Sequence, residues 1–130
     1  MWKTILVGYD GSEHSKKALR KAEKIAIQNC SNLVVVNVYR ELVTKSYSLS
    51  LLEEARKFLS EQISLETISA RNTDVDDELI EIAREHGADL IVVGSRGMGE
   101  AASLLLGSVS HGIANNSPVD VLIVRNKHMV

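Results

Sequence analysis

The sequence predicts an α/β fold in which one parallel sheet is covered by helices on both faces. Short runs rich in valine and isoleucine alternate along the chain with stretches whose apolar residues recur every three or four positions. The runs are typical of strands buried on both faces, and the stretches are typical of amphipathic helices. Because neighbouring parallel strands are joined by long crossovers, this alternation favours a doubly wound parallel sheet of five strands.

The first part of the chain contains two predicted strands joined by a helix. The first strand is the apolar run at residues 5–7, and a helix is predicted from about Ser12 to Asn29. The apolar residues of this helix form one stripe at spacings of three and four. The second strand is predicted at residues 33–38, where five of six residues are apolar and four are valine. That composition is expected for a strand buried on both faces.

The middle of the chain carries two further predicted helices with a strand between them. After the irregular residues 40–46, apolar residues again recur at helical spacing. Residues 63–70 alternate in polarity, which predicts a strand nearer to an edge of the sheet. The third helix is expected to begin at residues 73–76, where Thr73 supplies a hydroxyl cap and acidic residues follow. It is expected to stop at Gly87, which suits a left-handed C-cap.

The last part of the chain contains two predicted strands and a short helix. Residues 90–93 are a continuous apolar run, which predicts a buried fourth strand. The connection over residues 94–107 is punctuated by glycines, and a short helix is predicted at residues 108–116. The dipeptide at 117–118 ends that helix, and the final strand is predicted at residues 119–124.

Composition and charge narrow the classes of function. The 130 residues include 15 Lys and Arg against 17 Asp and Glu, and a net charge of −2 gives no reason to expect nucleic acid or an anionic membrane as partner. The single cysteine, Cys30, excludes an internal disulfide and a cysteine-rich metal site. The apolar run at residues 5–7 is too short for a signal-peptide core or a membrane span. We therefore expect a cytoplasmic protein of one domain.

Two glycine-containing turns are expected to meet at one edge of the sheet. Residues 8–12 follow the first strand and residues 94–99 follow the fourth. In open α/β sheets, ligands bind beyond the carboxyl ends of the strands, where the winding reverses. The second turn leads to Gly107 and Ser108 at a helix start, whose free N–H groups and positive dipole end suit a phosphate. Arg96 is a candidate for additional positive charge.

These turns lie within stretches that resemble a known family. The chain is similar to the universal stress protein family at residues 5–12, 94–110 and 118–124. Within the second stretch, the glycines are spaced as in the ATP-binding signature of that family, Gly94-x2-Gly97-x9-Gly107-Ser108. The resemblance implies one universal stress protein domain over residues 1–130, with an adenine nucleotide alpha hydrolase-like fold and the strand order 3-2-1-4-5.

The resemblance also implies roles for particular residues. Gly8 and Asp10 are expected beside the nucleoside, and the backbone of Val38 is expected to contact adenine. Val93 and Gly94 are expected near the ribose and phosphates. The phosphate chain is expected to be held by Gly97, Gly107, Ser108, Val109 and Ser110. The implied ligand is ATP, and Mg²⁺ is expected to arrive with the nucleotide, because the chain offers no acidic cage near the second glycine turn.

Simpler roles remain open for the same residues. The glycines of residues 94–99 also suit a tight loop that binds nothing. Asp10 also suits a turn that caps the first helix, a role that Ser12 can equally fill. The histidines are scattered singly, and no acid is placed to complete a triad with Ser108 and His111. No catalytic residue and no metal ligand is therefore assigned.

Three functions follow, and we prefer the first. It is an ATP-binding regulatory protein of the stress response, which holds the nucleotide at the carboxyl ends of the first and fourth strands. The alternatives are a slow ATPase and a dimeric scaffold that binds no nucleotide. A homodimer is expected through residues 119–124, because the last strand in the order 3-2-1-4-5 has an open edge that a second copy can pair. The regulatory partner is not identified by the sequence.

Overall fold

The computed structural model of the protein describes residues 1–97 and 106–125. The strands are β1 (Thr4–Gly8), β2 (Asn32–Tyr39), β3 (Ser64–Arg71), β4 (Leu90–Gly94) and β5 (Asp120–Val124). The helices are α1 (Glu13–Asn29), α2 (Lys45–Phe58), α3 (Val75–Glu85) and α4 (Ser108–Asn116). Part of two predicted features lies outside the described residues: Met98 and Gly99 of the second glycine turn, and Leu104 and Leu105 of the stretch that follows it.

All five strands pair in parallel, in the order β3-β2-β1-β4-β5. Val7 of β1, for example, pairs with Val35 of β2 on one side and with Val92 of β4 on the other. This confirms the predicted doubly wound α/β fold and its strand order. The winding reverses between β1 and β4, so the connections that leave these two strands run to opposite faces of the sheet. The space between them is where ligands bind in open α/β sheets.

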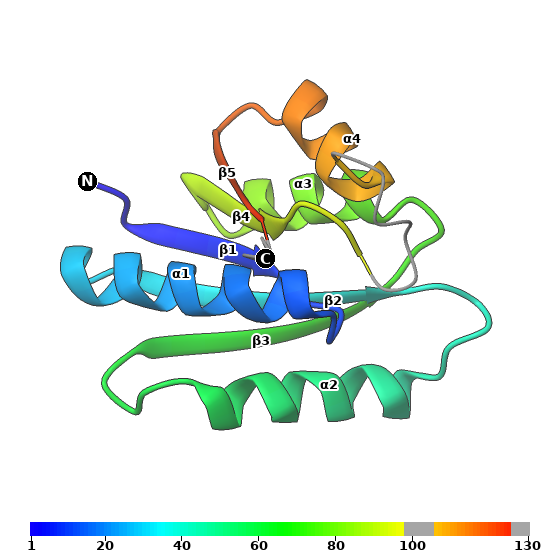
Figure 1. The fold of residues 1–130 in the computed structure, drawn as a ribbon, viewed down its shortest axis with the longest axis horizontal. Helices are drawn as coiled ribbons and strands as arrows, with labels where there is room; N and C mark the ends of the chain where they lie inside the picture. The colour runs from blue at the N-terminus through cyan, green and yellow to red at the C-terminus, as the bar shows by residue number, and fades with distance from the viewer. Residues whose placement is uncertain (98–105, 126–130) are drawn as a thin grey trace, which may run out of the picture.

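The helices form two layers, with α1 and α2 on one face of the sheet and α3 and α4 on the other (Figure 1). Alternate residues of a central strand serve opposite layers. Ile5 and Val7 pack in the core below α1 and α2, whereas Leu6 packs in the core below α3 and α4, and all three side chains are fully buried. A strand buried on both faces needs an apolar residue at every position, which explains the continuous apolar runs.

The strands at the two edges of the sheet are less well covered. β3 is half-buried over most of its length, as the alternating pattern predicted, and β5 is half-buried from Val121 to Val124. Each pairs with a neighbouring strand on one side only, β3 with β2 and β5 with β4. The described part of the chain therefore leaves one side of β5 open along its length.

Particular residues at the helix ends determine where α1 and α3 begin and end. Ser12 caps α1, because its hydroxyl accepts a hydrogen bond from the backbone N–H of Ser15 at 3.2 Å. Gly87 follows the C-cap of α3 with a φ of 65°, as predicted for a left-handed residue. The predicted cap at Thr73 is wrong. The carboxamide oxygen of Asn72 instead accepts from the N–H of Asp74 at 3.0 Å, and this turn starts α3 at the next residue.

Candidate functional site

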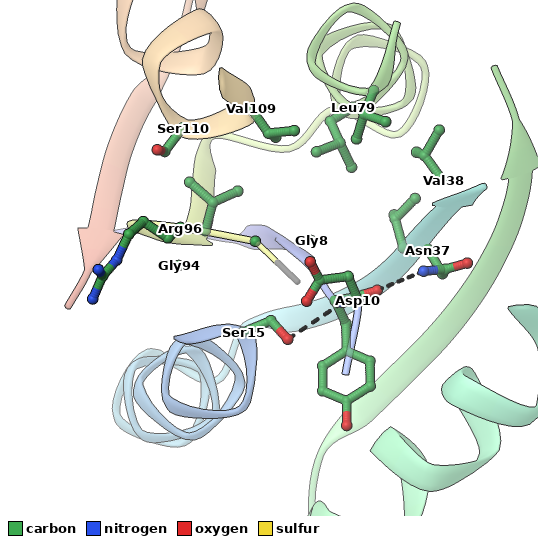
Figure 2. Close-up of a pocket in the computed structure, with 15 residues that line it drawn as sticks. Gly8, Asp10, Ser15, Asn37, Val38, Leu79, Gly94, Arg96, Val109 and Ser110 are labelled. Carbon is green, nitrogen blue, oxygen red and sulfur yellow. Dashed lines mark hydrogen bonds between the residues drawn. The ribbon is translucent and has the colours of Figure 1, made fainter. Parts of the chain in front are cut away.

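A pocket lies at the carboxyl ends of β1, β2 and β4, between α1 on one side and α3 and α4 on the other (Figure 2). It holds about 480 Å³ of empty space, counting the solvent at its open mouth. The described residues that line it are Gly8, Tyr9, Asp10, Ser15, Val36, Asn37, Val38, Val75, Leu79, Val93, Gly94, Arg96, Gly97, Val109 and Ser110.

One wall of the pocket is apolar. Val36 and Val38 come from β2, Leu79 comes from α3, and Val93 comes from β4, and these side chains belong to the core below α3 and α4. Val109 in the first turn of α4 completes this wall (Figure 2). An apolar wall with a few polar groups at its margin is the usual lining of a small-molecule site.

The turn after β1 places a carboxylate in the pocket. Asp10 lines the pocket, and its Oδ1 accepts a hydrogen bond from the N–H of Ser12 at 2.9 Å. The backbone N–H of Asp10 donates to the hydroxyl of Ser15 at 3.3 Å. Because Ser12 performs the capping of α1, the carboxylate of Asp10 shapes the turn and faces the pocket at the same time (Figure 2).

A buried carboxamide that the sequence analysis did not single out ties β2 to this turn. Asn37 is 4% exposed, and its Nδ2 donates to the backbone oxygen of Tyr9 at 2.8 Å. Its Oδ1 is buried and has no hydrogen-bond partner among the described residues. The amide therefore fixes the backbone between Gly8 and Asp10, where both residues line the pocket.

The side chain of Tyr9 anchors the same turn to α2. Its hydroxyl donates to Oε1 of Glu54 at 2.6 Å. Burial raises the pKa of the Tyr9 phenol well above its usual range, and the hydrogen bond to the Glu54 carboxylate adds to the shift. The phenol therefore remains a hydrogen-bond donor at physiological pH.

Ser95, directly after β4, joins three parts of the site. Its N–H donates to the backbone oxygen of Val124, and its own carbonyl accepts from the N–H of Gly107 at 2.6 Å and from the hydroxyl of Ser110 at 2.7 Å. These bonds hold the start of α4 at the end of β4. Gly107 is the N-cap of α4 and supplies no capping side chain. Val109 and Ser110 of the first turn line the pocket, so the positive end of the α4 dipole lies close to it.

The two glycines at the ends of β1 and β4 have different neighbours. A Cβ added to Gly8 would lie 3.2 Å from Cδ1 of Leu79 and 3.4 Å from Cγ1 of Val93, on the apolar wall. A Cβ added to Gly94 would lie 2.7–2.8 Å from backbone and Cβ atoms of His14 in α1. Gly94 is thus required by the close packing of α1 on β4, in addition to any approach of a ligand.

The guanidinium of Arg96 is not directed at the centre of the pocket. Its stem lines the pocket, but Nη2 lies 3.0 Å from Nε2 of His14. Figure 2 shows the side chain pointing away from Asp10 and Gly8. From the sequence, Arg96 was a candidate for additional charge beside a phosphate or for a side chain pointing into solvent; in the structure its guanidinium contacts His14 of α1.

Most of the residues proposed from sequence lie together. Those lining the pocket are Gly8, Asp10, Val38, Val93, Gly94, Arg96, Gly97, Val109 and Ser110. Gly107 and Ser108 do not line it, although both belong to the start of α4. The lining residues that were missed are Tyr9, Ser15, Val36, Asn37, Val75 and Leu79. A usable signal existed for Asn37, the one polar residue within the apolar run of β2.

The described residues offer little for a metal ion. Within 1–97 and 106–125, no three side chains of His, Cys, Asp or Glu gather closely enough to hold one. Asp10 is the single carboxylate among the described residues of the pocket lining. In the same part of the chain, no helix is both long enough and apolar enough to cross a bilayer.

Comparisons with known proteins agree with this architecture. The sequence profile of the Universal stress protein family matches residues 1–125. Universal stress protein YxiE of Bacillus subtilis is 35% identical over 96% of this chain and 100% of its own length. A universal stress protein of Thermus aquaticus, named for the 3′ region of a QAH/OAS sulfhydrylase, is 36% identical with the same coverage. A universal stress protein solved in complex with cAMP superimposes with a TM-score of 0.81 at 33% identity, covering 97% of this chain and 98% of its own.

Proposed function

The chain belongs to the universal stress protein family, and on that premise we propose that it binds an adenine nucleotide in the pocket at the carboxyl ends of β1, β2 and β4. The observation that carries the proposal is the apolar wall between β2 and α3, which lies next to Asp10 and to the start of α4. A relative at 33% identity has been solved with cAMP, which supports a nucleotide as the ligand.

Each part of a nucleotide has a suitable counterpart in the pocket. The base fits the apolar wall, where Val38, Leu79 and Val93 can pack against its faces. The carboxylate of Asp10 can accept hydrogen bonds from ribose hydroxyls. The phosphate fits the first turn of α4, where the positive end of the helix dipole favours an anion. The site residues inferred from sequence would thus all contact one bound nucleotide.

We further propose ATP as the ligand and regulation of the stress response as the role, in the cytoplasm. The spacing of Gly94, Gly97 and Gly107 supports ATP, since it resembles the ATP-binding signature of the family. Mg²⁺ is proposed to enter with the nucleotide, because a magnesium ion retains most of its waters and needs few protein ligands. Asp10 alone among the described lining residues could supply a carboxylate.

Isothermal titration calorimetry with a panel of ligands tests this proposal. We expect ATP to bind with a stoichiometry of one per chain, with and without Mg²⁺, and GTP to bind far more weakly. The panel includes cAMP, AMP and adenosine, which rank the contribution of the phosphates, and Mg²⁺ alone, which should give no binding heat. Failure of every adenine compound to bind would contradict the proposal, and so would equal affinity for GTP and ATP.

A slow ATPase remains the second candidate. Hydrolysis needs a group that orients or deprotonates the attacking water. Among the described lining residues, Asp10 is the single carboxylate, and one of its oxygens already accepts from Ser12. We therefore expect ATP to be held rather than turned over, and a sensitive phosphate-release assay distinguishes the two outcomes.

The open side of β5 supports the proposal of a homodimer. β5 lies at the edge of the sheet, and its residues from Val121 to Val124 are apolar and half-buried. Exposed edges of this kind are usually covered, charged or paired in natural proteins. Two-fold pairing of β5 with β5 of a second copy would satisfy the open backbone groups and cover the apolar side chains.

Light scattering coupled to gel filtration tests the dimer. At micromolar concentration we expect twice the 14.3 kDa mass of one chain. Val121→Pro should convert the dimer to a monomer, because proline removes a backbone donor and does not fit a paired strand. Circular dichroism must show that the variant remains folded. A monomeric parent protein, or a folded variant that stays dimeric, would contradict an interface at β5.

A further inference from the structure

We propose that His14 is a positioning residue, which holds the guanidinium of Arg96 outside the nucleotide pocket. The inference rests on the proposed function, because it concerns the charge that the pocket presents to a nucleotide. Among the described residues that line the pocket, Arg96 carries the only positive charge. The position of this one side chain therefore affects how much a phosphate adds to the affinity for a nucleoside.

The contacts of His14 define its hydrogen-bonding state. Nε2 lies 3.0 Å from Nη2 of Arg96, and Nδ1 lies 2.8 Å from Oγ of Ser95. A guanidinium can only donate, so Nε2 must carry a lone pair. The proton of a neutral imidazole is then on Nδ1, which donates to the hydroxyl of Ser95. This pair of contacts is satisfied by one neutral tautomer.

The surroundings of His14 keep the imidazole in place. His14 lies in the first turn of α1, and a Cβ added to Gly94 would lie only 2.7–2.8 Å from its atoms. Ser95 is 1% exposed, and its carbonyl is held by Gly107 and Ser110. The acceptor offered to Arg96 is therefore part of the packed junction between α1, β4 and α4.

The consequence is that the positive charge of Arg96 is held at a distance from the centre of the pocket. Figure 2 shows the Arg96 side chain directed away from Asp10 and Gly8, and His14 accepts from its outer end. Hydrogen bonds that involve a charged group are stronger than neutral ones. A phosphate that draws the guanidinium into the pocket must first break this bond, so part of the attraction between Arg96 and the phosphate is lost.

Two substitutions at position 14 separate the contacts of the two ring nitrogens. In the favourable rotamers, the amide of asparagine lies near the place of Nδ1, and the amide of glutamine lies near the place of Nε2. His14→Asn should therefore keep the bond to Ser95 and lose the acceptor for Arg96. His14→Gln should keep an acceptor for Arg96. Calorimetry with adenosine and AMP then gives, for each variant, the affinity that the phosphate adds.

We expect the ratio of AMP affinity to adenosine affinity to rise at least roughly tenfold in His14→Asn, as judged from the worth of one hydrogen bond to a charged group. His14→Gln should keep the ratio of the parent protein. In the double variant with Arg96→Met, the gain of His14→Asn should disappear, because no guanidinium remains to be released. Adenosine affinity is the internal reference, since it reports on the pocket without a phosphate.

Three results would overturn the inference. The first is a ratio that stays the same or falls in His14→Asn. The second is a change in His14→Gln as large as that in His14→Asn. The third is an equal loss of affinity for both ligands, which would indicate a purely structural role. Nitrogen-15 NMR of the ligand-free protein gives an independent test. We expect His14 to carry its proton on Nδ1. A proton on Nε2 instead would exclude the hydrogen bond from Arg96. If the parent protein binds neither adenosine nor AMP, the proposed function itself fails, and this inference with it.

Discussion

Replacing Gly94 with alanine is expected to lower the free energy of unfolding by about 3 kcal/mol, at the upper end of the usual cost of overpacking. The added methyl group would lie 2.7–2.8 Å from the carbonyl carbon, Cβ and carbonyl oxygen of His14. Two of these atoms belong to the backbone of α1, which cannot move away without leaving β4. Urea unfolding followed by circular dichroism measures the change.

Gly8→Ala is the matched control for that measurement. Gly8 ends β1 as Gly94 ends β4, but its added methyl group would meet Cδ1 of Leu79 at 3.2 Å, the mobile end of a side chain. We expect a cost below about 1 kcal/mol for this variant, since Leu79 can adjust its rotamer. Equal stability of the Gly94→Ala and Gly8→Ala proteins would show that α1 does not constrain β4 through Gly94.

The case of Gly94 illustrates what the sequence could and could not predict. The pattern correctly placed a glycine turn after β4 at the carboxyl edge of the sheet. The resemblance placed Gly94 near the ribose and phosphates, and the structure adds the close packing of α1 against it, which the pattern did not indicate. The contact between residues 14 and 94 depends on how a helix packs across two strands. Local periodicity carries no information on the distance between that helix and the strands.

Elements with strong local signals were predicted closely. The helix expected at residues 108–116 is observed at Ser108–Asn116, because a glycine precedes it and a Ser-Pro pair follows it. The start of α3 falls within the predicted residues 73–76, but the predicted cap at Thr73 is wrong, because the carboxamide of Asn72 forms the turn before the helix. Both side chains favour turns, and only the geometry shows which one accepts the hydrogen bond.

The lining residues proposed from sequence lie on the two glycine turns, β2, β4 and α4, whereas both lining residues of α3, Val75 and Leu79, were missed. Leu79 is a core residue of α3, since it is 2% exposed. It lines the pocket because α3 begins beside the carboxyl end of β2. An apolar residue that serves both the core and a pocket has the same sequence pattern as one that serves the core alone.

Replacing Gly8 with valine is expected to weaken the binding of adenine nucleotides by at least about a hundredfold, which corresponds to roughly 2.7 kcal/mol. The Cβ of residue 8 would point between Leu79 and Val93, on the apolar wall proposed to hold the base. The two further methyl groups of valine would then occupy space needed by the ligand. Calorimetry with ATP, or with whichever adenine nucleotide binds the parent protein most tightly, measures the loss.

The fold should survive this change, which makes the loss of binding specific. Gly8 is the last residue of a strand and has no positive φ, so a β-branched residue suits its backbone. Thr4→Val, at the other end of β1, introduces the same side chain away from the pocket and should leave the affinity unchanged. A folded Gly8→Val protein that binds the nucleotide as tightly as the parent would mean that the base does not lie against Leu79 and Val93. The nucleotide would then occupy another part of the protein.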